Sequence, residues 1–125
     1  MISISIEQII YLQRKLLEAT GGLDGLRDKA LLESALSSAF QTFDGVDLYP
    51  SIVAKVARIT YGLVRNHPFV DGNKRIGTYV MVVLLELNRV QAEFSDDDII
   101  RIGMELANET MDDKQLLHLI LERLL

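Results

Sequence analysis

Apolar residues recur every three or four positions along most of the chain, which is the spacing that places them on one face of an α-helix. The pattern predicts six helices. The first begins after Ser5, because Ser5 and Gln8 have the spacing of a capping box, and it ends at the glycine pair 21–22. The second begins after Asp28, a good N-cap residue, and continues through Leu36.

The later helices are predicted from similar signals. Pro50 suits the first turn of a third helix, which runs to about Asn66. Ser95 caps a fifth helix, and the three aspartates after it favour the positive end of the helix dipole. Thr110 and Asp113 start a sixth helix, which continues into the leucines at the end of the chain. Most of the chain is therefore expected to be helical.

Two segments depart from the amphipathic pattern. Residues 40–49 contain the tight-turn dipeptide Asp44-Gly45 between apolar neighbours, which predicts a small hairpin or flap. The fourth helix, from Asn73 to Leu87, has few polar positions. A helix that is apolar on all sides is buried, so we expect this one at the centre of an all-α fold.

Composition narrows the class of protein. The chain has 125 residues, 49% of them apolar, which suits one domain over residues 1–125 with a packed core. It has no cysteine, which excludes disulfides, thiolate metal sites and cysteine nucleophiles, and two histidines are too few for a multi-histidine zinc site. The longest apolar stretch, residues 76–85, is about half of a membrane span, and no export signal is evident. We therefore expect a cytoplasmic protein with no membrane partner.

Charge is distributed unevenly along the chain. The net charge is −5 at pH 7, yet residues 51–75 hold five basic side chains and one acidic side chain. Proteins that bind nucleic acid usually have a broad basic face, which this acidic chain lacks. The local excess of positive charge instead favours a small anionic ligand and no direct contact with nucleic acid.

The candidate site is the polar loop that leads into the buried fourth helix. The first amides of a helix have no partners within it, and they favour an anion such as phosphate. Gly72 lets a phosphate approach the backbone, and Lys74 and Arg75 add two positive charges. Asp71 is a suitable oxygen ligand for Mg²⁺, and His67 is a base near neutral pH. These are the groups that phosphoryl or nucleotidyl transfer requires.

Structural explanations exist for several of these residues. His67 could cap the preceding helix, and Asp71 and Asn73 are ordinary turn and N-cap residues. Two cations at a helix start oppose the helix dipole, so their placement favours the functional explanation. We expect Phe69 to be a core anchor of the loop and His118 to be a structural residue of the last helix.

Residues 67–75, His-Pro-Phe-Val-Asp-Gly-Asn-Lys-Arg, fit the pattern H-x-F-x-[DE]-[GA]-N-[GK]-R and resemble the signature of the Fic/Doc family. Residues 4–5, 21–22, 25–28 and 31–36 resemble the Doc, or death-on-curing, branch of that family. The resemblance implies a compact Fic/Doc-type bundle of about six helices, in which the motif loop leads into a central helix.

Two reactions are known in proteins of this kind. Typical Fic enzymes transfer AMP from ATP to a protein hydroxyl, with glycine where this chain has Lys74 and a second arginine where it has Thr78. Doc toxins have lysine at the first of these positions and bind the nucleotide reversed. The resemblance therefore implies a toxin that acts as a protein Ser/Thr kinase with ATP and Mg²⁺, phosphorylates elongation factor Tu and stops translation.

The same resemblance implies a role for each motif residue. His67 would be the catalytic base and Asp71 the Mg²⁺ ligand, while the predicted hairpin would be the flap that holds the target segment. Phosphates would be bound by Asn73, Lys74, Arg75 and the amides near Gly72. No glutamate of the chain is followed by glycine or asparagine, so the family's inhibitory pattern [ST]-x-x-x-E-[GN] is absent. We therefore expect a separate antitoxin to restrain the protein.

Two alternatives to the kinase stay open. One is an AMP-transferring enzyme of the same fold, against which Lys74 and Thr78 both count. The other is a catalytically silent interaction module that keeps the fold and a phosphate site. The presence of both His67 and Asp71 disfavours that second alternative.

Overall fold

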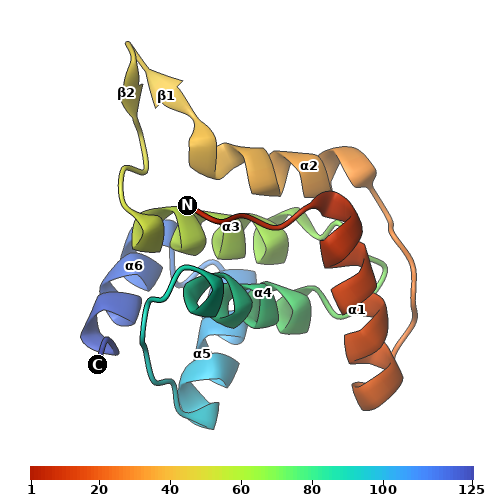
Figure 1. Ribbon diagram of the computed structural model, residues 1–125. Helices are drawn as coiled ribbons and strands as arrows, with labels where there is room; N and C mark the ends of the chain where they lie inside the picture. Colours follow the sequence, from red (N-terminus) through yellow and green to blue (C-terminus); the bar gives the residue numbers. More distant parts are fainter.

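The computed structural model describes all 125 residues and shows six helices with one small hairpin (Figure 1). In chain order the elements are α1 (Ile6–Thr20), α2 (Lys29–Ser37), the short 3-10 turn η1 (Ser38–Phe40), β1 (Thr42–Phe43), β2 (Val46–Asp47), α3 (Ile52–Asn66), α4 (Asn73–Leu87), α5 (Asp96–Ala107) and α6 (Asp113–Glu122). The two strands pair antiparallel across the predicted turn. The predicted all-α fold with a hairpin before the motif is confirmed.

Three predicted helix starts are confirmed by their capping bonds. Ser5 and Gln8 form a complete capping box at α1, and the Asp28 side chain accepts from the amide of Leu31 at α2. Ser95 forms a capping box with Asp98 at α5. Each cap satisfies an amide that the helix itself leaves without a partner. The cap and this amide are three residues apart, so the pair can be recognised in the sequence.

Two predicted starts are wrong by one or two residues. The N-cap of α3 is Ser51, whose side chain accepts from the amide of Ala54, so Pro50 lies just outside the helix. The N-cap of α6 is Asp112, because the Thr110 hydroxyl donates instead to the carbonyl of Glu105 at the end of α5. Helix α6 ends at Glu122, and the last leucines lie beyond it.

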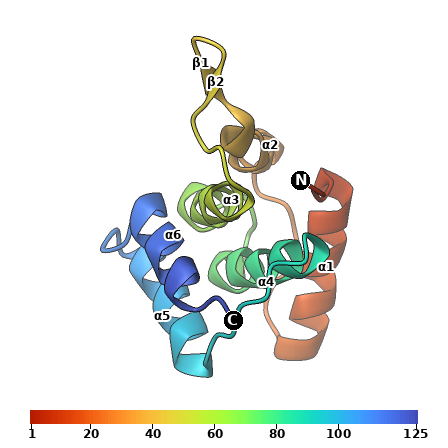
Figure 2. The same cartoon turned by 60° about the vertical axis from the view of Figure 1, so that its left-hand side comes forward.

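The core forms where α3 and α4 cross. In Figure 2 these two helices occupy the middle, with α1 on one side, α5 and α6 on the other, and α2 above α3. Glycine allows the close approach at two crossings. A Cβ on Gly77 of α4 would lie 2.6 Å from a Val64 methyl of α3, and one on Gly62 of α3 would lie 2.9 Å from the Cα of Ala35 in α2. The central position expected for the fourth helix is thus confirmed, and α3 shares it.

Helix α4 tests this architecture by mutation. Leu84 is fully buried in the core cluster, and Leu87, one turn later, is 43% exposed. Leu84→Ala should lower the free energy of unfolding by about 2–4 kcal/mol, because it removes buried apolar surface and leaves a cavity. Denaturant unfolding measures the change, with Leu87→Ala as the matched control on the same helix. Equal small losses at both positions would contradict the central placement of α4.

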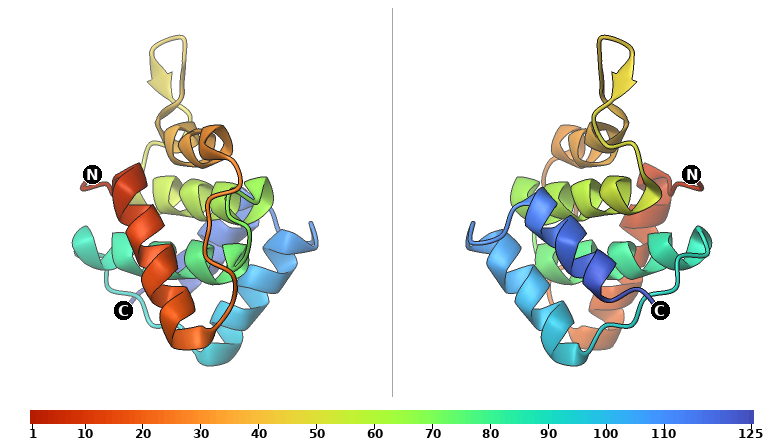
Figure 3. Two further views of the ribbon diagram at one scale, coloured as in Figure 1. Left: turned by 90° about the vertical axis from the view of Figure 1, so that its right-hand side faces the viewer. Right: turned by 90° about the vertical axis from the view of Figure 1, so that its left-hand side faces the viewer.

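The hairpin lies far from the motif loop. It precedes the first residue of α3, whereas the motif loop follows the last, and a helix of 15 residues is roughly 22 Å long (Figures 1 and 3). Lys55 near the start of α3 fixes the base of the hairpin by pairing with Asp47, and Phe43 and Val46 are exposed near its tip. The expectation that this hairpin holds a target segment beside His67 is therefore corrected, since a full helix length separates them.

None of the helices combines the length and apolar content that crossing a membrane requires.

Candidate active site

The motif loop begins where α3 is forced to end. Pro68 cannot continue a helix and restricts the residue before it. His67 is the C-cap of α3 and adopts the left-handed conformation, with φ 52° and ψ 52°. This backbone geometry turns the chain away from the helix axis and leaves the His67 side chain exposed.

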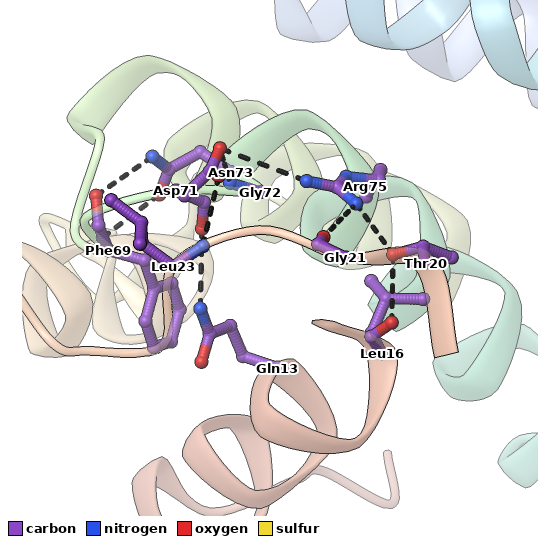
Figure 4. Close-up of polar contacts among 10 residues, drawn as sticks. All are labelled: Gln13, Leu16, Thr20, Gly21, Leu23, Phe69, Asp71, Gly72, Asn73 and Arg75. Atoms are coloured by element: carbon purple, nitrogen blue, oxygen red, sulfur yellow. Dashed lines mark hydrogen bonds and ion pairs between the residues drawn. The ribbon is translucent and has the colours of Figure 1, made fainter. Parts of the chain in front are cut away.

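Phe69 and Asn73 close the loop from inside. Phe69 is 1% exposed in the core. The Asn73 side chain accepts from the Phe69 amide (2.9 Å) and donates to the Phe69 carbonyl (3.0 Å), as Figure 4 shows. The oxygen and one N–H of this side chain bond to the Phe69 backbone, so Asn73 holds the loop. The backbone amide of Asn73 and the second N–H of its side-chain NH2 stay available to a bound anion.

The start of α4 differs from the start of every other helix. Its N-cap is Gly72, in the left-handed conformation with φ 76°, and it has no capping side chain, whereas the other five helices are capped by serine or aspartate. The backbone amides of Asn73, Lys74 and Arg75 have no hydrogen-bond partner in the protein. Unpaired amides and the helix dipole together favour a phosphate or another anion at this end.

The loop and the start of α4 form an open cleft of about 380 Å³. It is lined by His67, Val70, Asp71, Gly72, Asn73, Lys74 and Arg75. The structure thus brings together all of the residues predicted for catalysis, metal binding and phosphate binding. Lys74 is exposed and has neither an ion pair nor a side-chain hydrogen bond within the protein, which leaves its ammonium group free for a ligand.

The Asp71 carboxylate, which lines the cleft, is held by backbone amides. It accepts from the amides of Leu23 (3.2 Å) and Gly72 (2.8 Å), and Arg75 lies 3.8 Å away. Chiefly the bond from Leu23, then the bond from Gly72 and the charge of Arg75, lower the pKa of Asp71 below its usual value. Because the folded-state pKa is the lower one, the ionised carboxylate stabilises the fold at neutral pH. That contribution is lost as the pH falls through the lowered pKa.

Part of the Arg75 guanidinium forms hydrogen bonds within the protein. Its guanidinium donates to the Thr20 hydroxyl (2.6 Å) and to the Gly21 carbonyl (2.9 Å), which ties α4 to the end of α1 (Figure 4). A guanidinium has five N–H donors, so others stay available for an anion in the cleft. The positive charge near the carboxyl end of α1 is also favourable for that helix.

The local excess of basic residues seen in the sequence is mostly unrelated to the cleft. Lys55 pairs with Asp47, and Arg58 and Arg65 pair with acidic residues of the α5–α6 region. Two of the five basic side chains, Lys74 and Arg75, lie at the cleft. The excess of positive charge in residues 51–75 therefore supports an anion site only through Lys74 and Arg75, because the other three basic side chains form ion pairs elsewhere.

The residues present fit a magnesium ion only together with a ligand that brings its own oxygens. No three side chains of histidine, aspartate or glutamate come together as a metal cluster. Mg²⁺ is commonly held by one or two carboxylates plus substrate phosphates. Asp71, beside amides suited to phosphate, is one such carboxylate.

Sequence reasoning missed the segment that supports the loop from outside. Residues 21–28, between α1 and α2, run beside the motif loop (Figure 3). Leu26 forms an isolated bridge with Phe69, the Val70 amide donates to the Gly25 carbonyl, and Gln13 of α1 donates to the Asp71 carbonyl (3.3 Å). These are mostly backbone contacts, which have no sequence signature. The available signals were the glycines of this segment, which suit a loop, and the resemblance of residues 21–22 and 25–28 to the Doc branch of the family.

A family model provides the decisive comparison. The model of the Fic/DOC family matches residues 3–85, well over half of the chain. The chain belongs to the Fic/DOC family. It is also 38% identical over 96 residues to a protein of Mycolicibacterium smegmatis (strain ATCC 700084 / mc(2)155) named Toxin Doc. That match covers 75% of this chain and 74% of the relative.

The anion site of this Fic/DOC loop can be tested without any reaction. Titration with pyrophosphate should shift the amide resonances of Asn73, Lys74 and Arg75, because these N–H groups have no partner in the protein. The first amides of α5 should not move, since Ser95 satisfies the amide of Asp98 and the three aspartates of that first turn repel an anion. Nuclear magnetic resonance of the labelled protein measures both. Equal shifts at α4 and α5 would mean nonspecific binding and would contradict the site.

Proposed function

We propose that this protein is the toxin of a toxin–antitoxin module and acts as a protein kinase. It transfers the terminal phosphoryl group of ATP to a serine or threonine hydroxyl of a target protein. The observation that carries the proposal is the free Lys74 side chain in a cleft with His67 and the uncapped start of α4. The relative named Toxin Doc supports the assignment as a toxin, and family members generally transfer nucleotide or phosphate groups.

The cleft supplies a group for each part of the reaction. The hydroxyl oxygen of the target forms a bond to the terminal phosphorus of ATP, the bond from that phosphorus to the bridging oxygen breaks, and ADP leaves. The His67 ring nitrogen accepts the hydroxyl proton, which is the part of a general base. The amides of residues 73–75, with Lys74 and Arg75, bind and orient the phosphates.

Asp71 is the residue that would hold Mg²⁺ in this site. The ion neutralises phosphate charge when it is bound. The low pKa of Asp71 keeps the carboxylate ionised at neutral pH, the form that a cation requires. The carboxylate is also oriented by two backbone amides, so it needs little reorganisation to meet a ligand.

The AMP-transferring alternative is disfavoured at a second position. In relatives that transfer AMP an arginine occupies the place of Thr78, and here the Thr78 side chain is 5% exposed. Its hydroxyl donates to the carbonyls of Lys74 and Arg75, in the turn before it. Thr78 is thus committed to its own helix and supplies no phosphate ligand.

The target and the partner follow from the same proposal. The target is a translation elongation factor of the Tu type, so that modification inhibits translation in the cytoplasm. The partner is a cognate antitoxin, because the chain lacks the inhibitory glutamate pattern that restrains other family members. Neither nucleic acid nor a membrane takes part directly.

A bacterial lysate provides the test. The protein is incubated with lysate, ATP and Mg²⁺, and the modified proteins are identified by mass spectrometry. We expect the added mass of one phosphoryl group on a serine or threonine of an elongation factor. The mass of an adenylyl group would establish the AMP-transferring alternative, and no modification by the wild-type protein would favour the silent binding module.

A further inference from the structure

Arg27 makes an unusual set of contacts at the end of α3. Its side chain donates through Nε to the His67 carbonyl (2.7 Å) and through Nη2 to the Asn66 carbonyl (3.1 Å). Its backbone amide donates to the Pro68 carbonyl (2.7 Å). One residue from the α1–α2 segment therefore satisfies three successive carbonyls at the point where the motif loop begins.

These carbonyls need partners from outside the helix. The last carbonyls of a helix have no amide available within it, so a side chain or water must supply the donor. His67 adds a further requirement, because residues with a side chain adopt the left-handed conformation only sparingly. A guanidinium fixed to the carbonyls of residues 66 and 67 restricts the peptide groups that set the His67 backbone angles.

We infer that Arg27 is a positioning residue that holds His67 in its left-handed conformation and so aims the imidazole into the cleft. The inference rests on the proposed function in one respect, that His67 acts as the base. Arg27 itself lines no part of the cleft, and it acts through the backbone of His67. It is thus a further residue on which the reaction depends, outside the sequence motif.

The rest of the loop does not depend on Arg27. Leu26 bridges Phe69, Gly25 accepts from the Val70 amide, and Asn73 holds both polar groups of Phe69. Arg27 is itself exposed, so its truncation removes little buried surface. Loss of its side chain should therefore release His67 while the core and the anion site stay folded.

A rival explanation is that Arg27 only places a positive charge at the carboxyl end of α3, where the helix dipole favours one. Lysine separates the two explanations. A lysine at this position keeps the charge but has a single ammonium group in place of the planar fork that reaches two carbonyls. Under both explanations Arg27→Lys should keep the stability of the protein. If Arg27 positions His67, the lysine variant should lose activity, and if Arg27 only supplies a charge, the variant should keep it.

The experiment compares Arg27→Ala and Arg27→Lys with wild-type protein. Arg14→Ala is the matched control, because Arg14 is an exposed arginine that pairs with Asp24 of the same segment and does not touch the motif loop. We expect both Arg27 variants to lower kcat for phosphoryl transfer by about 10- to 100-fold, since misplacement of a reacting group costs about this much. The KM for ATP should stay within about twofold, because the phosphate site is intact. Millimolar guanidinium should partly restore kcat in Arg27→Ala.

A second readout does not require activity. The imidazole resonances of His67 should shift in both Arg27 variants and stay unchanged in Arg14→Ala. Wild-type kcat in Arg27→Lys, unchanged His67 resonances, or a parallel loss of kcat and Tm in Arg27→Ala would each overturn the positioning role. If the wild-type protein transfers no group at all, the proposed function fails, and the His67 resonances still decide whether Arg27 positions the ring.

Discussion

Replacing His67 with alanine should lower the rate of group transfer by about 10²- to 10⁴-fold, the usual contribution of a general base. His67 is exposed and lines the cleft, so the free energy of unfolding should change little. The variant should still bind pyrophosphate, because the amides at the start of α4 do not depend on the imidazole. Kinetic assay, thermal unfolding and titration of one protein sample measure the three quantities.

His118→Ala is the matched control for this variant. His118 is the other histidine of the chain, it is also exposed, and it lies on α6 in a different hollow between α5 and α6. Its removal should leave the transfer rate within about twofold of wild type. If His67→Ala unfolds the domain, His67 is a structural helix cap, and if it retains full activity, another group is the base.

Local signals explain why much of the fold was predictable. Ser5, Asp28 and Ser95 cap their helices through side chains three residues from the amides they satisfy, so the interaction lies within one short stretch of sequence. The scarcity of polar positions in α4 likewise indicated its burial. Predictions of this kind succeed when the stabilising contact and its partners are close in sequence.

The predictions that were wrong depended on contacts made elsewhere. Thr110 has the character of an N-cap, but its hydroxyl bonds to Glu105 across the turn from α5, and Asp112 takes the capping role. The placement of the hairpin depended on the direction in which α3 runs from it, which a pattern of turn residues does not encode. In both cases the outcome depended on tertiary contacts, and the local sequence was compatible with more than one arrangement.

The candidate site shows the same division. The motif predicted which residues line the cleft, because Gly72 and the first turn of α4 are adjacent in sequence. It could not predict that the Asn73 side chain would bond to both the amide and the carbonyl of Phe69, or that the amide of Leu23 would orient Asp71 from another segment. The bonds between Asn73 and Phe69 lie within the motif, whereas the bond from Leu23 comes from a segment far away in the sequence. Together they hold the groups of the motif in fixed orientations.

The second large effect concerns which phosphorus reaches the target. ATP labelled at its terminal phosphate should transfer label to the target protein, and ATP labelled at its innermost phosphate should transfer none. The expectation follows from Lys74, which stands in the cleft where AMP-transferring relatives have glycine. Under the proposed function, we expect its side chain to fill space that nucleotide phosphates take in those relatives and to present a cation to a terminal phosphate instead.

Lys74→Gly tests that explanation directly. Loss of the ammonium group should lower transfer of the terminal label by about 10- to 1000-fold, because preorganised charge is a large part of catalysis in phosphoryl transfer. It should also open the space in which transfer of the innermost label becomes measurable. The matched control is Lys114→Gly, since Lys114 is the second residue of α6 as Lys74 is the second residue of α4, and both changes weaken a helix start equally. Transfer of the innermost label by the wild-type protein would replace the kinase with an AMP-transferring enzyme, and unchanged terminal transfer in Lys74→Gly would show that the lysine does not select the reaction.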